Sequence, residues 1–93
     1  MTPQLSILIP FYRDDPSVLL QSLDAQAVEG DRVEILIMDD GTGDADLTQA
    51  ATATVSQMTL PTILHTAEAN RGRSATRNAL QELAKSDWVL FLD

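Results

Sequence analysis

Four short segments of this 93-residue chain carry side chains that could bind a charged or hydrogen-bonding ligand. They are the adjacent acids Asp39 and Asp40, the arginine-rich run 70–77, the segment 10–14, and Asp93 at the last position. Adjacent carboxylates in a turn can hold a divalent cation or accept hydrogen bonds from a base or a sugar. They can equally accept backbone amides in an Asx-turn, with the following glycine at positive φ. The pair therefore predicts either a polar ligand site or an ordinary turn.

Half of the six basic residues fall within seven positions, as Arg71, Arg73 and Arg77. This run opens a predicted helix, where unpaired backbone amides and the helix dipole favour a phosphate group. Arg73 and Arg77 are four residues apart and can share one face of that helix. The alternative interpretation is an ordinary helix start, capped by Ser74, with arginines that face solvent.

Apolar runs and helix signals alternate along the chain and supply the elements that would position these residues. The predicted strands cover residues 5–9, 33–38, 61–65 and 88–92. The predicted helices cover residues 16–29, with a stop at Gly30, then 47–58 and 74–85. Strict alternation with short connections predicts right-handed crossovers and a three-layer α/β fold with a mostly parallel sheet. In such a sheet ligands bind beyond the carboxyl ends of the strands, where all four segments lie.

Local signals refine these elements. Pro10 is expected to end the first strand, because proline cannot donate to a sheet ladder. Asp15 is expected to cap the first helix, with Pro16 as its first residue. Trp88 is expected in the core, and the fourth strand at an exposed edge of the sheet. The helix residues expected to face inward are Leu19, Leu20, Leu23 and Ala27, then Leu47, Ala50, Ala51, Val55 and Met58, and finally Ala79, Leu80, Leu83 and Ala84.

Composition excludes several classes of protein. The net charge is −8, and residues 1–46 account for it, with ten acids and two arginines. This charge argues against binding to nucleic acid or to an anionic membrane surface. The absence of cysteine excludes a disulfide scaffold and a thiolate metal site. No apolar run approaches the roughly 20 residues of a membrane span and no targeting segment is visible, so we expect a cytoplasmic protein.

Taken together and in order, the segments resemble the start of an inverting family 2 glycosyltransferase of the GT-A fold. Residues 6–12 are similar to the opening motif S-I-I-I-P-x-Y-N, and residues 34–44 to E-I-I-V-V-D-D-G-S-x-D. Residues 69–78 resemble N-x-G-x-x-x-A-R-N, with Thr76 in place of the usual alanine. Residues 88–93 resemble the strand that leads into the D-x-D metal motif. A further departure is arginine at position 13, where the family usually has asparagine.

The resemblance implies contacts with a nucleotide sugar for ten residues of this chain. They are Pro10, Phe11, Tyr12, Asp39, Asp40, Asn70, Gly72, Arg73, Arg77 and Asp93. Tyr12 would lie beside the uracil or equivalent base, and Asp40 would accept a hydrogen bond from it while Asp39 shapes the turn. Arg77 would contact the diphosphate or the base. Asp93 would touch the ribose or a divalent cation, Mn²⁺ or Mg²⁺, that neutralises the leaving diphosphate.

The function implied is inverting transfer of a sugar from a nucleotide-diphosphate sugar, expected to be a UDP-sugar, to an unknown carbohydrate or lipid-linked acceptor. Residues 1–93 would be the incomplete N-terminal nucleotide-sugar-binding part, truncated after the fourth strand, with the general base beyond residue 93. The chain alone is then expected to be inactive. The alternative is a non-catalytic nucleotide-binding or interaction module, and a homo-oligomer formed through the sheet edge is a further hypothesis. A receiver-type signalling domain is disfavoured, because its third strand ends in an aspartate and this one ends at His65.

Overall fold

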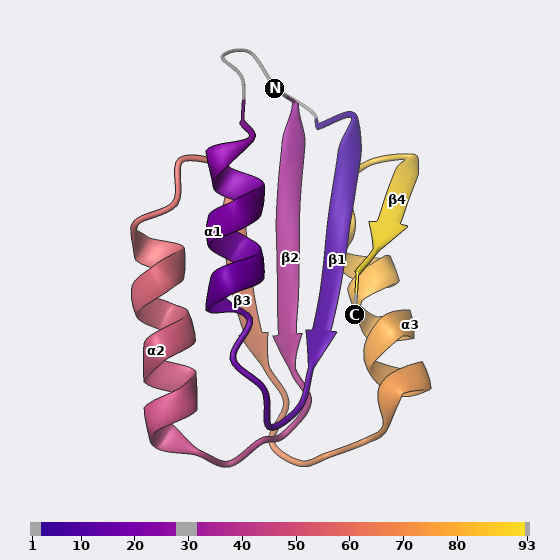
Figure 1. Ribbon diagram of the computed structural model, residues 1–93. Helices are drawn as coiled ribbons and strands as arrows, with labels where there is room; N and C mark the ends of the chain where they lie inside the picture. The colour runs from indigo at the N-terminus through magenta and orange to yellow at the C-terminus, as the bar shows by residue number, and fades with distance from the viewer. Residues whose placement is uncertain (1–2, 28–31, 93) are drawn as a thin grey trace.

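The alternating runs form one parallel sheet with helices on both faces in the computed structural model, which describes residues 3–27 and 32–92 (Figure 1). The strands are β1 (Leu5–Phe11), β2 (Val33–Asp39), β3 (Thr62–Thr66) and β4 (Trp88–Phe91). The helices are α1 (Ser17–Ala25), α2 (Ala45–Ser56) and α3 (Arg73–Leu83). The strand order is β3-β2-β1-β4 and every pair is parallel. The predicted α/β class is therefore confirmed, and so is the edge position of the fourth strand among the described strands.

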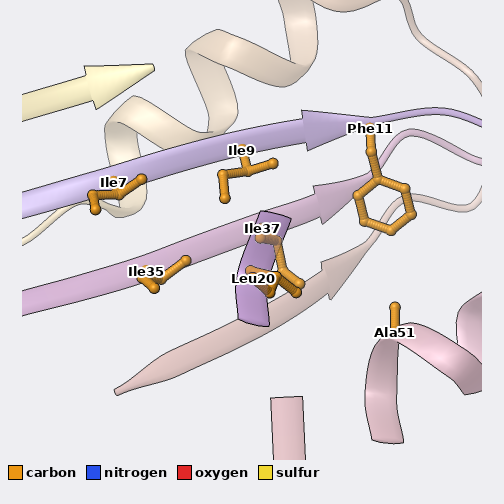
Figure 2. Packing of buried hydrophobic residues seen from close by; sticks show 7 residues of the cluster. All are labelled: Ile7, Ile9, Phe11, Leu20, Ile35, Ile37 and Ala51. Atoms are coloured by element: carbon orange, nitrogen blue, oxygen red, sulfur yellow. The ribbon is translucent and has the colours of Figure 1, made fainter. Parts of the chain in front are cut away.

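Successive side chains of β1 and β2 enter two apolar cores, one on each face of the sheet. The core on the side of α1 and α2 contains Ile7, Ile9, Phe11, Leu20, Ile35, Ile37 and Ala51 (Figure 2). The core on the side of α3 contains Leu8, Leu36, Met38 and Leu80. Strands covered on both faces need apolar residues at consecutive positions, which explains the unbroken apolar runs in these two strands.

Pro10 lies inside β1, opposite Met38 of β2, so the prediction that it ends the strand was wrong. The amide of Leu92 donates to the carbonyl of Leu8, which shows that Leu8 directs its backbone groups toward β4. Pro10 is two residues further on and faces the same side. The pairing of β4 with β1 ends at Leu8, so no described strand lies beside the Pro10 nitrogen. The proline therefore costs the sheet no hydrogen bond.

Helix α1 begins at Ser17, one residue later than predicted, with Pro16 at the N-cap position. The prediction that Asp15 is the N-cap residue was therefore wrong, although its Oδ1, one position earlier, accepts the Ser17 amide at 2.9 Å and the Ser17 hydroxyl at 2.6 Å. The helix ends at Ala25, and the predicted stop at Gly30 lies outside the described residues. Within the described ranges, no helix is long and apolar enough to cross a membrane.

Several core predictions fail at the margins of the fold. Trp88 is 75% exposed, because it stands on the edge strand β4 in register with Leu5. Helices α1 and α2 cover its face of the sheet only over β2 and β3, and they do not reach β4 (Figure 1). Leu83 is at the end of α3 and is 42% exposed, and Ala50 of α2 is exposed as well. The apolar stripe of a short helix thus extends past the surface that the sheet can cover.

A buried polar cluster closes the end of the sheet opposite to the loops that follow β1 and β2. Glu34 Oε2 accepts the Ser6 hydroxyl at 2.5 Å and the backbone amide of Lys85 at 2.8 Å. Ser6 Oγ also lies 3.0 Å from Ser86 Oγ, whose hydroxyl donates to it, because the single proton of Ser6 goes to Glu34. These bonds tie β1, β2 and the segment after α3 together, so the serine and glutamate that open two of the motifs are architectural here.

Asp24 joins the end of α1 to the segment before β3. Its carboxylate accepts the Leu60 amide at 2.8 Å and the Thr59 amide at 2.9 and 3.0 Å. These backbone bonds, the one from Leu60 first, hold the pKa of Asp24 below its usual value, because they stabilise the charged form.

Candidate functional site

A pocket of about 490 Å³ opens where the chain leaves β1, β2 and β3. Its walls come from the segment between β1 and α1, the turn after β2, and the start of α3. The lining residues are Ile9, Pro10, Phe11, Tyr12, Asp14, Asp15, Pro16, Leu19, Asp40, Asn70, Gly72, Arg73 and Thr76. Seven of the ten residues predicted for the site lie here, at the carboxyl edge of the sheet as expected.

Asp40 is buried, with 4% of its surface exposed, and its carboxylate organises the floor of the pocket. Oδ1 accepts the Arg71 amide at 2.9 Å, and Oδ2 accepts the Gly72 amide at 3.1 Å and Asn70 Nδ2 at 3.0 Å. Asn70 Nδ2 also donates to the Asp40 carbonyl at 3.1 Å. A carboxylate offers about four acceptor positions, so these three bonds leave one for a ligand. Asp40 therefore holds the segment after β3 in place, in addition to facing the pocket.

Gly41 permits this approach of two loops. Its φ is +72°, and a Cβ atom at this position would lie 2.2 Å from the carbonyl carbon of Ala69 and 2.3 Å from the nitrogen of Asn70. No side chain fits between these backbones, since real Cβ contacts of this length do not occur. The glycine after the acidic pair is thus required by contact as well as by backbone angle.

Asp39 does not line the pocket. Its side chain is buried at 1% exposure and points toward α2, where Oδ1 accepts the Thr42 amide at 2.9 Å and Oδ2 accepts the Thr48 hydroxyl at 3.1 Å. The predicted turn-shaping role agrees with these bonds, whereas its inclusion among the ligand contacts finds no geometric support. The pair thus combines both interpretations, the ordinary turn and the ligand site: Asp39 forms the turn and Asp40 lines the pocket.

Tyr12 stands at the mouth of the pocket with 40% of its surface exposed. The guanidinium carbon of Arg13 lies 5.0 Å from the centroid of its ring. The Arg13 amide donates to Thr42 Oγ1 at 2.9 Å, which links this segment to the turn after β2. An aromatic ring at such a mouth can stack on the flat face of a nucleobase.

Helix α3 points its N-terminus into the pocket. Gly72 is the N-cap residue at φ +95°, and no side chain caps the helix, so the alternative in which Ser74 caps it was wrong. Thr76 is fully buried in the first turn, and its hydroxyl donates to the Gly72 carbonyl at 3.0 Å. The amide dipoles of this first turn and the guanidinium of Arg73 together favour an anion at this wall.

The three clustered arginines diverge instead of forming one cationic face. Arg73 lines the pocket, whereas the Arg71 guanidinium donates to the sulfur of Met38 at 3.8 Å. The Arg77 guanidinium carbon lies 4.1 Å above the ring of Phe91 in β4 and is outside the pocket lining. Arg77 lies beside β4, and its contact with the diphosphate or the base of a nucleotide stays a prediction.

The sequence interpretation missed several lining residues. Asp15 borders the pocket together with Asp14, which belongs to the predicted segment 10–14 but was not among the ten named contacts, and the apolar side chains of Ile9, Pro16 and Leu19 form part of its wall. Their position between β1 and the start of α1 is the signal that could have found the two acids, since this connection lies at the ligand edge of the sheet. Apolar lining residues gave no signal, because the same pattern packs a core.

Asp93, the predicted metal ligand, lies outside the described residues. Within residues 3–27 and 32–92 no three histidine, aspartate or glutamate side chains converge in a way that could hold a metal ion. The carboxylates at the pocket already have other partners, since Asp40 accepts three hydrogen bonds and Asp15 accepts two from Ser17. This part of the chain does not by itself supply the ligand set that a divalent cation needs.

Comparison with known proteins agrees with this fold. The sequence model described as glycosyl transferase family 2 matches residues 6–93. The crystal structure of S. aureus TarS 1–349 in complex with UDP-GlcNAc superposes with a TM-score of 0.78 and 26% identity, over 97% of this chain and 26% of that chain. A second crystal structure of S. aureus TarS 1–349 gives 0.77 and 24%, over 97% of this chain and 27% of that one. The chain thus spans about a quarter of either, and no curated protein matches it significantly.

Proposed function

Because the chain belongs to glycosyl transferase family 2, we propose that its pocket binds the nucleotide of a nucleotide-diphosphate sugar, with a UDP-sugar as the donor. The observation that carries this proposal is the convergence of an aromatic ring, a buried carboxylate and an uncapped helix start around one pocket. The similar TarS structure was obtained in complex with UDP-GlcNAc, which supports a uridine nucleotide as the first ligand to test.

Each wall of the pocket matches one part of such a donor. The base would stack on Tyr12 and donate its ring N–H to the remaining acceptor position of Asp40. The diphosphate would lie toward Gly72 and Arg73, where the helix amides and the guanidinium supply hydrogen bonds and positive charge. The carboxylates of Asp14 and Asp15 line the pocket from the segment between β1 and α1, and they would suit hydroxyl groups of the ribose better than phosphate.

The reaction we propose is inverting transfer of the sugar to an acceptor hydroxyl. The acceptor oxygen would attack the anomeric carbon as the bond to the diphosphate breaks, and a base must take the proton of that hydroxyl. No described carboxylate is assigned that role, and we place the base in sequence outside these 93 residues. This chain would then bind the donor without transferring the sugar, and a carbohydrate or lipid-linked acceptor would bind elsewhere.

The family resemblance also implies Mn²⁺ or Mg²⁺ at Asp93, where a cation would neutralise charge on the leaving diphosphate. Uridine carries no phosphate whose charge a cation would neutralise, so the proposed binding of the nucleoside does not depend on a metal. Uridine affinity should accordingly be the same with and without EDTA.

The test is a titration of the isotope-labelled protein with uridine, UDP and CMP, followed by amide NMR. We expect UDP to bind more tightly than uridine, with shifted resonances for Tyr12, Asp40 and Gly72. Arg73→Gln should weaken UDP binding about tenfold and leave uridine unchanged, since a charge-assisted bond to phosphate is lost. Lys85→Gln removes the same charge at the opposite end of the sheet and is the matched control. Amide resonances that do not shift with any of the three ligands would contradict the proposed donor site.

A further inference from the structure

Arg13 occupies a backbone conformation that its side chain disfavours. Its φ is +54°, and it is the one residue other than glycine at positive φ among the described residues. Asparagine adopts this left-handed region several times more readily than arginine does, because its short amide bonds locally to the backbone. The turn itself is anchored without the side chain, since the Arg13 amide donates to Thr42 Oγ1 at 2.9 Å. The arginine is therefore not explained by the turn.

The contact that the arginine does make is with the neighbouring ring. Its guanidinium carbon lies 5.0 Å from the Tyr12 centroid, within the range of a cation–π interaction. Tyr12 lines the pocket and Arg13 does not, and from this we infer that the guanidinium covers the ring face turned away from the pocket. The ring is 40% exposed, and a side chain so open to solvent would otherwise sample several rotamers.

We propose that Arg13 is a positioning residue, which holds the Tyr12 ring in place so that its opposite face can stack on the base of the bound nucleotide. The proposal rests on the donor site proposed above. Its physical basis is preorganisation, because a ring that is already ordered loses less side-chain entropy when the ligand binds. Arginine at this position has an unfavourable backbone conformation, but its side chain holds the Tyr12 ring in one orientation.

The experiment measures uridine and UDP affinity by NMR titration for the wild type, Arg13→Asn and Arg13→Lys. Arg13→Asn should weaken uridine binding about three- to tenfold, the cost of ordering one side chain, while its melting temperature stays the same or rises. Arg13→Lys should remain within about twofold of the wild type, since an ammonium group also interacts with the ring face. A purely structural role would move affinity and melting temperature in the same direction.

A double-mutant cycle with Tyr12→Leu isolates the contribution of the ring. In the Tyr12→Leu background, Arg13→Asn should cause no further loss of uridine affinity. An equal loss in both backgrounds, or a loss seen with UDP alone, would overturn the proposal, since either shows that Arg13 acts without the ring. Wild-type protein that binds neither uridine nor UDP would overturn the donor site and this proposal with it, whereas wild-type binding that Arg13→Asn leaves unchanged would overturn this proposal alone.

Discussion

The replacement of Asp40 by asparagine tests how the floor of the pocket is held. All three groups that bond to this carboxylate are obligate donors: the amides of Arg71 and Gly72 and the side-chain NH₂ of Asn70. An asparagine at position 40 has one acceptor oxygen and one donor nitrogen, so at least one of these donors must face another donor. The least costly orientation places the oxygen where Oδ2 now lies and keeps two of the three bonds.

The magnitude follows from the bonds that change. Loss of the charge-assisted bond from the Arg71 amide costs about 2 kcal/mol, and the two surviving bonds weaken by about 0.5 kcal/mol each when the charge is removed. We therefore expect Asp40→Asn to lower the free energy of unfolding by about 3 kcal/mol. A domain of this size has on the order of 5–15 kcal/mol, so the variant should still fold.

The neighbouring acid provides the matched control. Asp39 is even more deeply buried, but one of its partners is the hydroxyl of Thr48, which can accept a bond as well as donate one. Asp39→Asn can keep the Thr42 amide on its oxygen and donate its NH₂ to Thr48, so it loses only the charge. We expect this variant to cost about 1 kcal/mol.

Urea denaturation at neutral pH, followed by far-UV circular dichroism, measures both variants on one scale. We expect Asp40→Asn to be the more destabilised of the two by about 2 kcal/mol. Equal losses, or a larger loss for Asp39→Asn, would refute it, because burial alone would then decide the cost and the type of bonding partner would not matter.

Three further outcomes follow from packing and titration. Gly41→Ala should lower the free energy of unfolding by more than about 2 kcal/mol in urea, since its Cβ would collide with the Ala69 backbone; Gly43→Ala, at φ +70° in open space, should cost only about 1 kcal/mol. Leu80→Ala, at the centre of the core under α3, should cost about 2–5 kcal/mol in the same assay. The lowered pKa of Asp24 stabilises the fold above the unfolded-state pKa, about 3.9, and the advantage is lost as the pH falls through the folded-state pKa. The melting-temperature gap to Asp24→Asn should therefore be steady at neutral pH and shrink below about pH 4.

The sequence was sufficient for the fold wherever local pattern and topology agree. The apolar runs of β1 and β2 and the turn glycine after Asp40 are strong signals, because a two-sided parallel strand and a close backbone contact admit few residue types. The prediction that Pro10 ends β1 was wrong because a missing amide disrupts a sheet only where a neighbouring strand would accept its hydrogen bond. Here the neighbour is β4, and its pairing with β1 stops at Leu8. The strand length of an edge neighbour cannot be read from the proline itself.

The site was predictable as a set of segments but less so as a set of side chains. Topology brings the three loops to one edge, which correctly groups Tyr12, Asp40 and Asn70. The direction of Arg77 could not be inferred, because a guanidinium four residues along a helix can reach either a phosphate or an aromatic ring, and Phe91 lies within 4.1 Å. The hydrogen bonds to Asp40 could not be predicted from the sequence either, since their donors are 30 to 32 residues away along the chain.

The outward position of Trp88 makes the single tryptophan of this chain a reporter of a particular kind. With 75% of the side chain in water, its emission should already be red-shifted in the folded state, so unfolding would change the fluorescence little. Anything that covers the face of β4 would instead shift the emission to shorter wavelength and shield the ring from iodide quenching. Tryptophan fluorescence should therefore respond little to unfolding of this protein and strongly to contacts made at the edge of its sheet.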